Sequence, residues 1–390
     1  MGIPGSAPKL HPLTGLRFLA AAFVVVFHLG FYSAVPSSNL LIDSWTSLGY
    51  VSVNLFFILS GYVLAWNYLD IDGRLTVSRR NFWLSRFARI YPAYALALLF
   101  ALPRFIALAR EGASPARGAI SLESPWTVFA TAMTTPLLLQ SWAGLVAWNS
   151  LAWTLSVEAF FYFLFPYVAP RIGKASPRRL VVCGFLCWLL PLSLAALYCL
   201  QATESVHSGA WYPRNMTTFT EGFLYASPLI HLPEFLLGVV LARLFQRRAG
   251  KPVEAWQEYA STVVTIGLLP LLALLPGPVF LRMLMPLFGW LIYALSHGRS
   301  WVARTLSTPL LLLLGEASYS LYLFHESAIF ALLPILGNTL GAVAFLLLIV
   351  GFSILVFTFV EAPCRKWIRE RTMPDPPESP QAATAHVAGS

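Results

Sequence analysis

The chain has little charge, because Asp, Glu, Lys and Arg together make up 11% of its 390 residues, against roughly a quarter in soluble domains. Hydrophobic residues make up 57%, in runs long enough to cross a bilayer. A soluble globular protein is excluded, and we expect an all-α, polytopic membrane protein in a lipid bilayer. The net charge of +9 does not indicate nucleic-acid binding, because the basic residues cluster in short loops between apolar runs.

Cysteines and processing signals are also scarce. None of the four cysteines has the spacing of a metal site, so we predict no metal centre. Residues 1–12 hold a single lysine and no small-residue cleavage site follows the first apolar run, so that run is expected to stay as a helix. No internal repeat is visible, which removes a feature common in secondary transporters.

Ten segments are long and apolar enough to be membrane spans. They are 13–33, 49–69, 90–109, 150–170, 180–200, 226–245, 259–276, 279–297, 308–334 and 339–361. The stretch 126–142 is shorter and rich in Thr and Pro, and we interpret it as interfacial or re-entrant. Residues 1–12 would be a short cytoplasmic N-terminus, 13–368 a single transmembrane domain, and 369–390 a disordered cytoplasmic tail.

Basic residues are unequally shared between alternate loops. One set of loops holds Arg74–Arg89, Arg171–Arg179, Arg243–Lys251, Arg299–Arg304 and Arg365–Arg371, whereas the other set holds Arg104, Arg110, Arg117 and Arg214. Because loops rich in Lys and Arg stay in the cytoplasm, the first set and both termini are predicted to be cytoplasmic.

The first apolar segment carries two residues that an inert lipid-facing helix does not need, Arg17 and His28. They are eleven positions apart, so both project from one face of a helix, roughly 16 Å apart along its axis. Snorkelling of the arginine to lipid headgroups and a simple interhelical hydrogen bond from the histidine are the structural alternatives. Matching polar groups in other segments favour a functional role.

Two further segments carry polar residues on or near one end. Asn54 lies in the outer part of the second segment, where Ser60 and Gly61 fit either a small-residue packing seam or the close approach of a ligand. Arg86 and Arg89 come just before the third segment. At i and i+3 they are placed to grip phosphates, or to anchor the helix at the cytoplasmic surface.

The fourth and ninth segments add acidic and aromatic groups. Glu158 lies several residues deep in an aromatic span, where an unpaired carboxylate is costly. In the ninth segment a polar stripe steps by three residues and is expected to face the bundle interior. Its members are Glu316, Tyr319, Tyr322 and His325.

Three more ionisable residues are interpreted as structural or uninformative. Glu361 lies before Pro363 beside a basic cluster and is expected to make a structural salt bridge. His231 and Glu234 enter the sixth segment from the outside and are expected to be partly solvated.

Depth along the helices separates these groups. At 1.5 Å per residue in a core of about 30 Å, Arg17 and the arginine pair stay near the cytoplasm, while His28, Glu158 and His325 lie deeper. This polarity suits a phosphorylated donor that enters from the cytoplasm. The alternative is a proton-coupled secondary transporter, in which buried charges and histidines serve as proton relays.

Taken in order, the motifs resemble the signature series of the acyltransferase-3 family of integral membrane O-acyltransferases, over about residues 11–368. The matching stretches are Arg17 with His28, residues 49–62, Arg86 with Arg89, Trp153–Glu158, and Tyr319–His325. The resemblance implies transfer of an acyl group, usually acetyl, from acyl-CoA to a hydroxyl of a glycan, a lipid-linked sugar or a small acceptor. It implies no permanently bound cofactor, and a bacterial-type inner membrane.

The resemblance also implies that Arg17 and His28 are the essential pair and that Arg86 and Arg89 hold coenzyme A. We predict that His28 is the general base, with His325 as its rival and Glu158 as an orienting carboxylate. The remaining assignments are Ser60, with Arg17, in the donor site, and Asn54, Trp153, Tyr319 and Tyr322 in the substrate pocket. Family members often carry an acid at position 54, and the asparagine here argues against an acid-base role.

Overall fold

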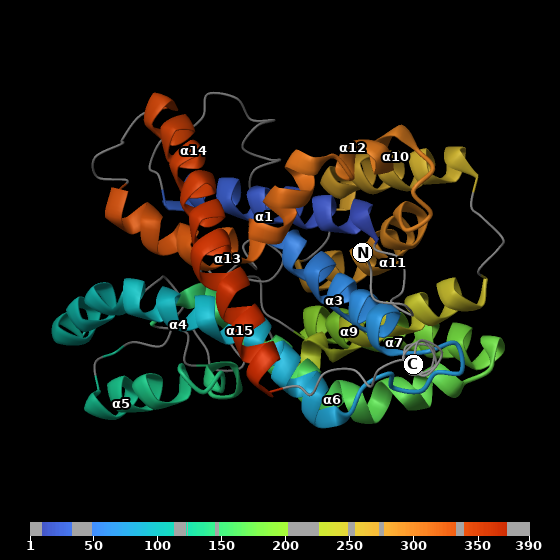
Figure 1. The fold of residues 1–390 in the computed structure, drawn as a ribbon, viewed down its shortest axis with the longest axis horizontal. Helices are drawn as coiled ribbons and strands as arrows, with labels where there is room; N and C mark the ends of the chain where they lie inside the picture. The colour runs from blue at the N-terminus through green and yellow to red at the C-terminus, as the bar shows by residue number, and fades with distance from the viewer. Residues whose placement is uncertain are drawn as a thin grey trace, which may run out of the picture.

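A computed structural model of the chain describes residues 10–32, 49–112, 122, 124–144, 148–201, 226–248, 254–272, 277–332 and 339–372. Within these ranges long helices cross one another in a bundle (Figure 1), and an isolated bridge between Leu69 and Leu75 is the only β-structure. The predicted all-α fold class is confirmed.

In chain order, the helices are α1 (His11–Tyr32), η1 (Gly49–Val51), α3 (Ser52–Tyr68), α4 (Arg79–Glu111), α5 (Pro125–Thr134), η2 (Gln140–Trp142), η3 (Ser150–Ala152), α6 (Trp153–Lys174), α7 (Pro177–Gln201), α9 (Pro228–Arg247), α10 (Ala255–Leu272), α11 (Gly277–Leu295), α12 (Trp301–Leu306), α13 (Pro309–Leu332), α14 (Thr339–Val356), η6 (Phe357–Glu361) and α15 (Ala362–Thr372).

Seven helical stretches among the described residues are long and apolar enough to cross a membrane. They contain α1, α3, α4, α6, α7, α9, and α14 with α15. The apolar helix Val279–Leu295 within α11 is shorter, and the predicted spans 259–276 and 308–334 correspond to α10 and α13. A multi-pass membrane protein is confirmed, whereas ten spans and cytoplasmic termini stay predictions.

Helix α4 begins much earlier than the predicted third span. Ser78 caps it by accepting a hydrogen bond from a main-chain N–H of the first turn, and the helix runs for 33 residues from Arg79, about 50 Å. It continues through Pro92, which removes only one main-chain donor. Arg86 and Arg89, which were expected just before the third span, therefore lie inside one continuous helix.

Helices α3 and α9 pack through a reciprocal pair of glycines. A Cβ atom on Gly61 would lie 2.0 Å from the carbonyl oxygen of Phe235, and one on Gly238 would lie 2.0 Å from that of Ile58. Any side chain at either position forces the two backbones apart. The predicted small-residue seam is confirmed for Gly61.

Helix α1 crosses α12 and α13 in the same way. A Cβ atom on Gly15 would lie 2.1 Å from the carbonyl oxygen of Leu306, and one on Gly315 would lie 2.1 Å from that of Thr14. The blue α1 and orange α13 cross in Figure 1. This close crossing sets the polar residues of α1 against the polar stripe of α13.

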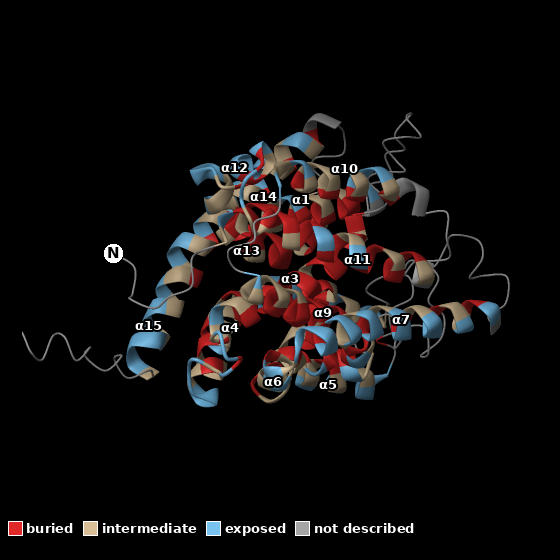
Figure 2. Cartoon of the chain, turned by 90° about the vertical axis from the view of Figure 1, so that its right-hand side faces the viewer, coloured by how far each residue is buried: buried red, intermediate tan, exposed pale blue. Residues whose placement is uncertain are grey.

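Burial separates the centre of the bundle from its flanks (Figure 2). Buried residues concentrate on α1, α3 and α9, whereas α7 and α14 expose large apolar side chains. On these two helices they are Val181, Val182, Phe185, Leu186, Leu189, Leu190, Leu194, Leu197, Leu200, Val343, Leu347, Leu348, Phe352 and Leu355. Apolar surface of this extent is suited to lipid.

The segment predicted to be interfacial or re-entrant contains α5, which has ten residues and is about 15 Å long, too short to span a bilayer. Beyond it the chain folds back onto the start of α6. There Gln140 donates a hydrogen bond to the carbonyl of Ala152 at 2.7 Å, and Ser141 donates one to the carbonyl of Trp153 at 2.7 Å.

The last helical stretch contains a π-helical turn, η6, between α14 and α15. The wider turn ends at Glu361, which is fully buried. Helix α15 then continues to Thr372, so it includes residues 369–372 of the segment predicted to be a disordered tail. Residues 373–390 lie outside the described residues.

Candidate active site

A cavity of about 720 Å³ lies between α1, α3, α4, α6 and α13 and is flanked by α15. Its lining residues His11, Asn67 and Arg369 are exposed and mark its mouth. Thr154 and Tyr322 line the opposite end and are buried. The cavity is therefore a blind pocket that opens on the side predicted to be cytoplasmic.

The cavity brings together seven predicted site residues from five helices. They are Arg17 on α1, Ser60 on α3, Arg86 and Arg89 on α4, Glu158 on α6, and Tyr319 and Tyr322 on α13. The cavity lining does not include His28, His325, Asn54 or Trp153. The predicted donor site and half of the predicted substrate pocket thus share one space.

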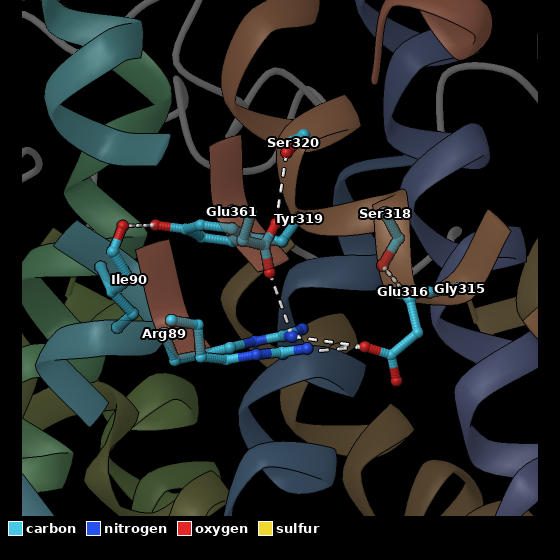
Figure 3. A network of polar contacts seen from close by, with 9 residues as sticks. Arg89, Ile90, Gly315, Glu316, Ser318, Tyr319, Ser320 and Glu361 are labelled. Atoms are coloured by element: carbon cyan, nitrogen blue, oxygen red, sulfur yellow. Dashed lines mark hydrogen bonds and ion pairs between the residues drawn. The ribbon is translucent and has the colours of Figure 1, made fainter. Parts of the chain in front are cut away.

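Arg89 is held in a network of polar contacts (Figure 3). One of its Nη atoms lies 3.1 Å from the Glu361 carboxylate and 3.5 Å from that of Glu316. Glu361 also accepts a hydrogen bond from Ser320 at 3.3 Å, and Tyr319 donates one to the carbonyl of Ile90 at 2.9 Å. The salt bridge predicted for Glu361 is confirmed, and its partner is Arg89.

Three other guanidinium groups on the cavity wall have no such partner. Among the described residues, no carboxylate oxygen lies within 4 Å of Arg17, Arg86 or Arg369. Arg86 instead donates a hydrogen bond to the hydroxyl of Tyr68 at 2.8 Å and stacks over the Tyr68 ring. These positive charges are available to an anionic ligand.

Glu158 belongs to the same cavity as Arg17. It accepts a hydrogen bond from the hydroxyl of Tyr162 at 3.3 Å. His28 lies roughly 16 Å further along α1 than Arg17. The structure therefore groups Glu158 with the arginine, and its role as a partner of His28 stays a prediction.

His28 and His325, predicted as rival bases, are hydrogen-bonded to each other. His28 Nδ1 lies 3.2 Å from His325 Nε2, and both side chains are buried. His325 Nδ1 faces the carbonyl oxygens of Leu321 at 3.2 Å and Tyr322 at 3.0 Å, so we assign the proton of the neutral ring to Nδ1. His325 Nε2 then accepts from His28.

The same reasoning assigns the His28 tautomer. His28 Nδ1 lies 2.9 Å from the carbonyl oxygen of Val24, which can only accept. The Nδ1 proton is therefore shared between that carbonyl and His325, and the lone pair is on Nε2 of His28. In this tautomer His28 is oriented by two acceptors and keeps its basic nitrogen on the other side of the ring.

Tyr322 lies between the cavity and the histidine pair. It lines the closed end, and its hydroxyl accepts a hydrogen bond from Thr154 at 3.1 Å. Its ring centroid is 6.0 Å from that of His325. The histidines thus lie one aromatic ring beyond the end of the cavity.

Sequence reasoning did not single out Glu326, which follows His325. Its side chain is buried and accepts a hydrogen bond from Ser150. The signal was present, because Glu326 is a carboxylate within an apolar segment, the criterion that selected Glu158.

Asn54 and Trp153 belong to a second buried cluster, centred on Glu234. This carboxylate is fully buried and accepts from Asn54 at 2.6 Å, from His231 at 2.9 Å and from Arg282. Trp153 packs against His231, with ring centroids 5.4 Å apart. The expectation that His231 and Glu234 are partly solvated was wrong, because α11 supplies Arg282 as a compensating charge.

Comparison with known sequences decides the family. The model of an acyltransferase domain family matches residues 11–360. The chain belongs to this acyltransferase family. Acyltransferase MdmB of Streptomyces mycarofaciens is 30% identical over 404 residues, which cover 96% of this chain and 97% of MdmB.

Other members of the family are longer than this chain. Putative O-acetyltransferases of Staphylococcus aureus are 22% identical over 91% of the chain and 57% of their own length. The peptidoglycan O-acetyltransferase OatA of Listeria monocytogenes is 23% identical over 91% of the chain and 55% of its own length. The chain thus spans just over half of these relatives, and no solved structure is significantly similar to it. The resemblance seen in the sequence is confirmed.

Proposed function

We propose that this membrane acyltransferase moves an acyl group, acetyl in the simplest case, from acyl-CoA to a hydroxyl of an acceptor. The observation that carries the proposal is a blind cavity whose wall holds three guanidinium groups without carboxylate partners among the described residues, and whose closed end lies one ring away from His28 and His325. Its volume, about 720 Å³, is within the usual range for small-molecule and cofactor sites.

Coenzyme A has the matching shape and polarity. It carries phosphates at one end and the thioester at the end of a long, thin pantetheine arm. With its phosphates at Arg17 and Arg86, the arm points toward Thr154 and Tyr322 at the closed end. Arginine suits the phosphates because its planar fork donates two parallel hydrogen bonds.

The transfer step needs a base for the acceptor hydroxyl. His28 Nε2 takes the proton as the hydroxyl oxygen attacks the thioester carbonyl, so that a C–O bond forms and the C–S bond breaks. The departing thiolate receives that proton and leaves as coenzyme A thiol. His28 keeps its orientation through the carbonyl of Val24 and His325 Nε2, the arrangement expected of a general base and its positioning partner.

For the acceptor we propose a chemical class and no single molecule. The Listeria relative acts on peptidoglycan by its name, and we infer an acceptor with sugar-like or similar aliphatic hydroxyls, such as a glycan, a lipid-linked sugar or a small molecule. A proton-coupled transporter, the alternative from the sequence, is not favoured because the relatives are named acyltransferases.

The proposal is tested with purified protein in lipid nanodiscs. Acetyl-CoA should bind saturably, and free thiol should appear only when a hydroxylated acceptor fraction is added. The His28→Ala variant should bind acetyl-CoA with unchanged affinity and release thiol more slowly than wild type by roughly 10² to 10⁴. Absence of acetyl-CoA binding to the wild-type protein would overturn the proposal.

A further inference from the structure

Helix α15 presents two arginines to the cavity that no motif of the sequence analysis had assigned to a ligand. Arg365 and Arg369 are four residues apart, lie on one face of the helix and both line the cavity. The sequence alone identifies Arg365 and Arg369 only as members of a basic cluster on the side predicted to be cytoplasmic. Their placement in the cavity wall calls for a more specific role.

The other cations of α15 are engaged elsewhere. Lys366 pairs with Glu370 at 3.8 Å, and its side chain is 77% exposed. Arg371 lies over the ring of Trp367, 4.5 Å from its centroid. The helix therefore directs two of its cations to the cavity and leaves two on its outer side, which provides matched controls.

The direction of Arg365 and Arg369 depends on the π-helical turn before them. A π-helical turn contains one residue more than an α-helical turn, so it rotates everything that follows by about 100°. Glu361, the last residue of the turn, pairs with Arg89 at 3.1 Å. The residue that engages Arg89 thus lies in the turn that sets the direction of α15.

The charge of the cavity wall is strongly positive. Five arginines line it against two carboxylates, Glu158 and Glu316. Arg365 shares Glu316 with Arg89, at 3.8 Å, beyond hydrogen-bond distance, whereas Arg369 has no carboxylate within 4 Å among the described residues. A ligand with several negative charges fits this wall.

We propose that Arg369 binds the 3′-phosphate of the donor's adenosine and that Arg365 contacts its diphosphate; this rests on the proposed acyl-CoA donor. In coenzyme A the diphosphate lies between the pantetheine arm and the adenosine. With the thioester at the closed end, the 3′-phosphate is therefore the outermost charge. Arg369 is the exposed arginine at the mouth of the cavity, and Arg365 lies one turn further in.

A donor that lacks the 3′-phosphate separates this role from membrane anchoring. The apparent affinities of acetyl-CoA and 3′-dephospho-acetyl-CoA are measured for wild type, Arg365→Ala, Arg369→Ala, and the controls Lys366→Ala and Arg371→Ala. Loss of a charge-assisted contact should weaken acetyl-CoA binding by about tenfold or more in Arg369→Ala. The same substitution should leave the affinity for the dephospho donor unchanged, whereas Arg365→Ala should weaken binding of both donors.

The controls distinguish a donor site from a lipid site. Lys366→Ala and Arg371→Ala should bind both donors as wild type does, in nanodiscs of phosphatidylcholine and in nanodiscs with phosphatidylglycerol. An equal loss for both donors in Arg369→Ala, no loss at all, or a loss seen only with the anionic lipid would overturn the inference. Failure of the wild-type protein to bind either donor would instead overturn the proposed function, and this inference with it.

Discussion

His28 Nδ1 lies 3.2 Å from His325 Nε2, although the two residues are 297 positions apart in the chain. The tight glycine crossing of α1 and α13 makes this contact reachable, since it brings the two helix axes together. The hydrogen bond gives the two histidines unequal roles. His28 donates its Nδ1 proton in this contact, whereas His325 accepts it on Nε2 and donates from Nδ1 to main-chain carbonyls.

The first prediction concerns this inequality. His28→Ala should lower the transfer rate by roughly 10² to 10⁴ while donor binding persists, because the reaction loses its general base. His325→Gln should retain more activity than His325→Ala, because the glutamine side-chain oxygen can accept the hydrogen bond that His28 Nδ1 donates. Rates are compared by thiol release at saturating donor. Full turnover by His28→Ala would contradict the assignment.

The second prediction separates Arg86 from Arg89, which the sequence treated as an equivalent pair. Arg89→Ala leaves the buried Glu361 carboxylate without its cation and should cost about 3 to 5 kcal/mol of stability. Arg86→Ala breaks no ion pair among the described residues and should mainly weaken donor binding. Thermal unfolding in detergent and donor titration measure the two effects.

A double variant checks the cause. Glu361→Gln removes the carboxylate charge that Arg89→Ala leaves unpaired. Adding Glu361→Gln to Arg89→Ala should therefore recover part of the lost stability. Identical behaviour of Arg86→Ala and Arg89→Ala in both assays would show that the structural distinction between them is wrong.

The third prediction concerns the second buried cluster. Glu234→Ala leaves Arg282 buried without its carboxylate and should destabilise the protein by about 3 to 5 kcal/mol. Replacing both residues with methionine should cost less than the single substitution, because no uncompensated charge remains. The unfolding temperatures of the two variants measure this difference. A double variant less stable than Glu234→Ala would contradict the prediction.

Charge in apolar segments was the most reliable guide in the sequence. Arg17, Glu158 and the stripe on α13 were expected to face the interior because lipid does not tolerate them, and the structure places Arg17, Glu158 and most of the stripe on one cavity. Arg282 passed unnoticed although it is the lone charge of the segment 279–297, and the same criterion would have selected it.

Pairings and helix phases could not be read from one sequence. Glu361 and Arg89 are far apart in the chain, and the packing of η6 and α15 against α4 brings them together. The π-helical turn before α15 has no local residue pattern that distinguishes it from an α-helix. The start of α4 was misplaced because residues 79–89 hold four arginines and therefore fall outside the apolar run, although the helix already begins at Arg79.

The fourth prediction tests topology. Reporter fusions in the loop 70–78 and after the C-terminus should both report the cytoplasm, because the basic sets Arg74–Arg89 and Arg365–Arg371 lie beside these positions. A fusion in the loop 113–121, after α4, should report the opposite side. An extracytoplasmic signal at residues 70–78 would place the cavity mouth on the wrong side for a cytoplasmic donor.

The last prediction concerns the glycine seam between α3 and α9. Gly61 has the carbonyl oxygen of Phe235 where a Cβ would lie, so Gly61→Val should force the helices apart and prevent stable folding. Gly351→Val on α14 is the matched control, because nothing among the described residues lies within 4 Å of its Cβ position. The control should keep near wild-type yield and unfolding temperature. Since Ser60 beside the seam lines the cavity, the milder Gly61→Ala should also weaken donor binding in whatever protein folds. Normal yield and donor affinity in both Gly61 variants would show that α3 and α9 do not pack this closely.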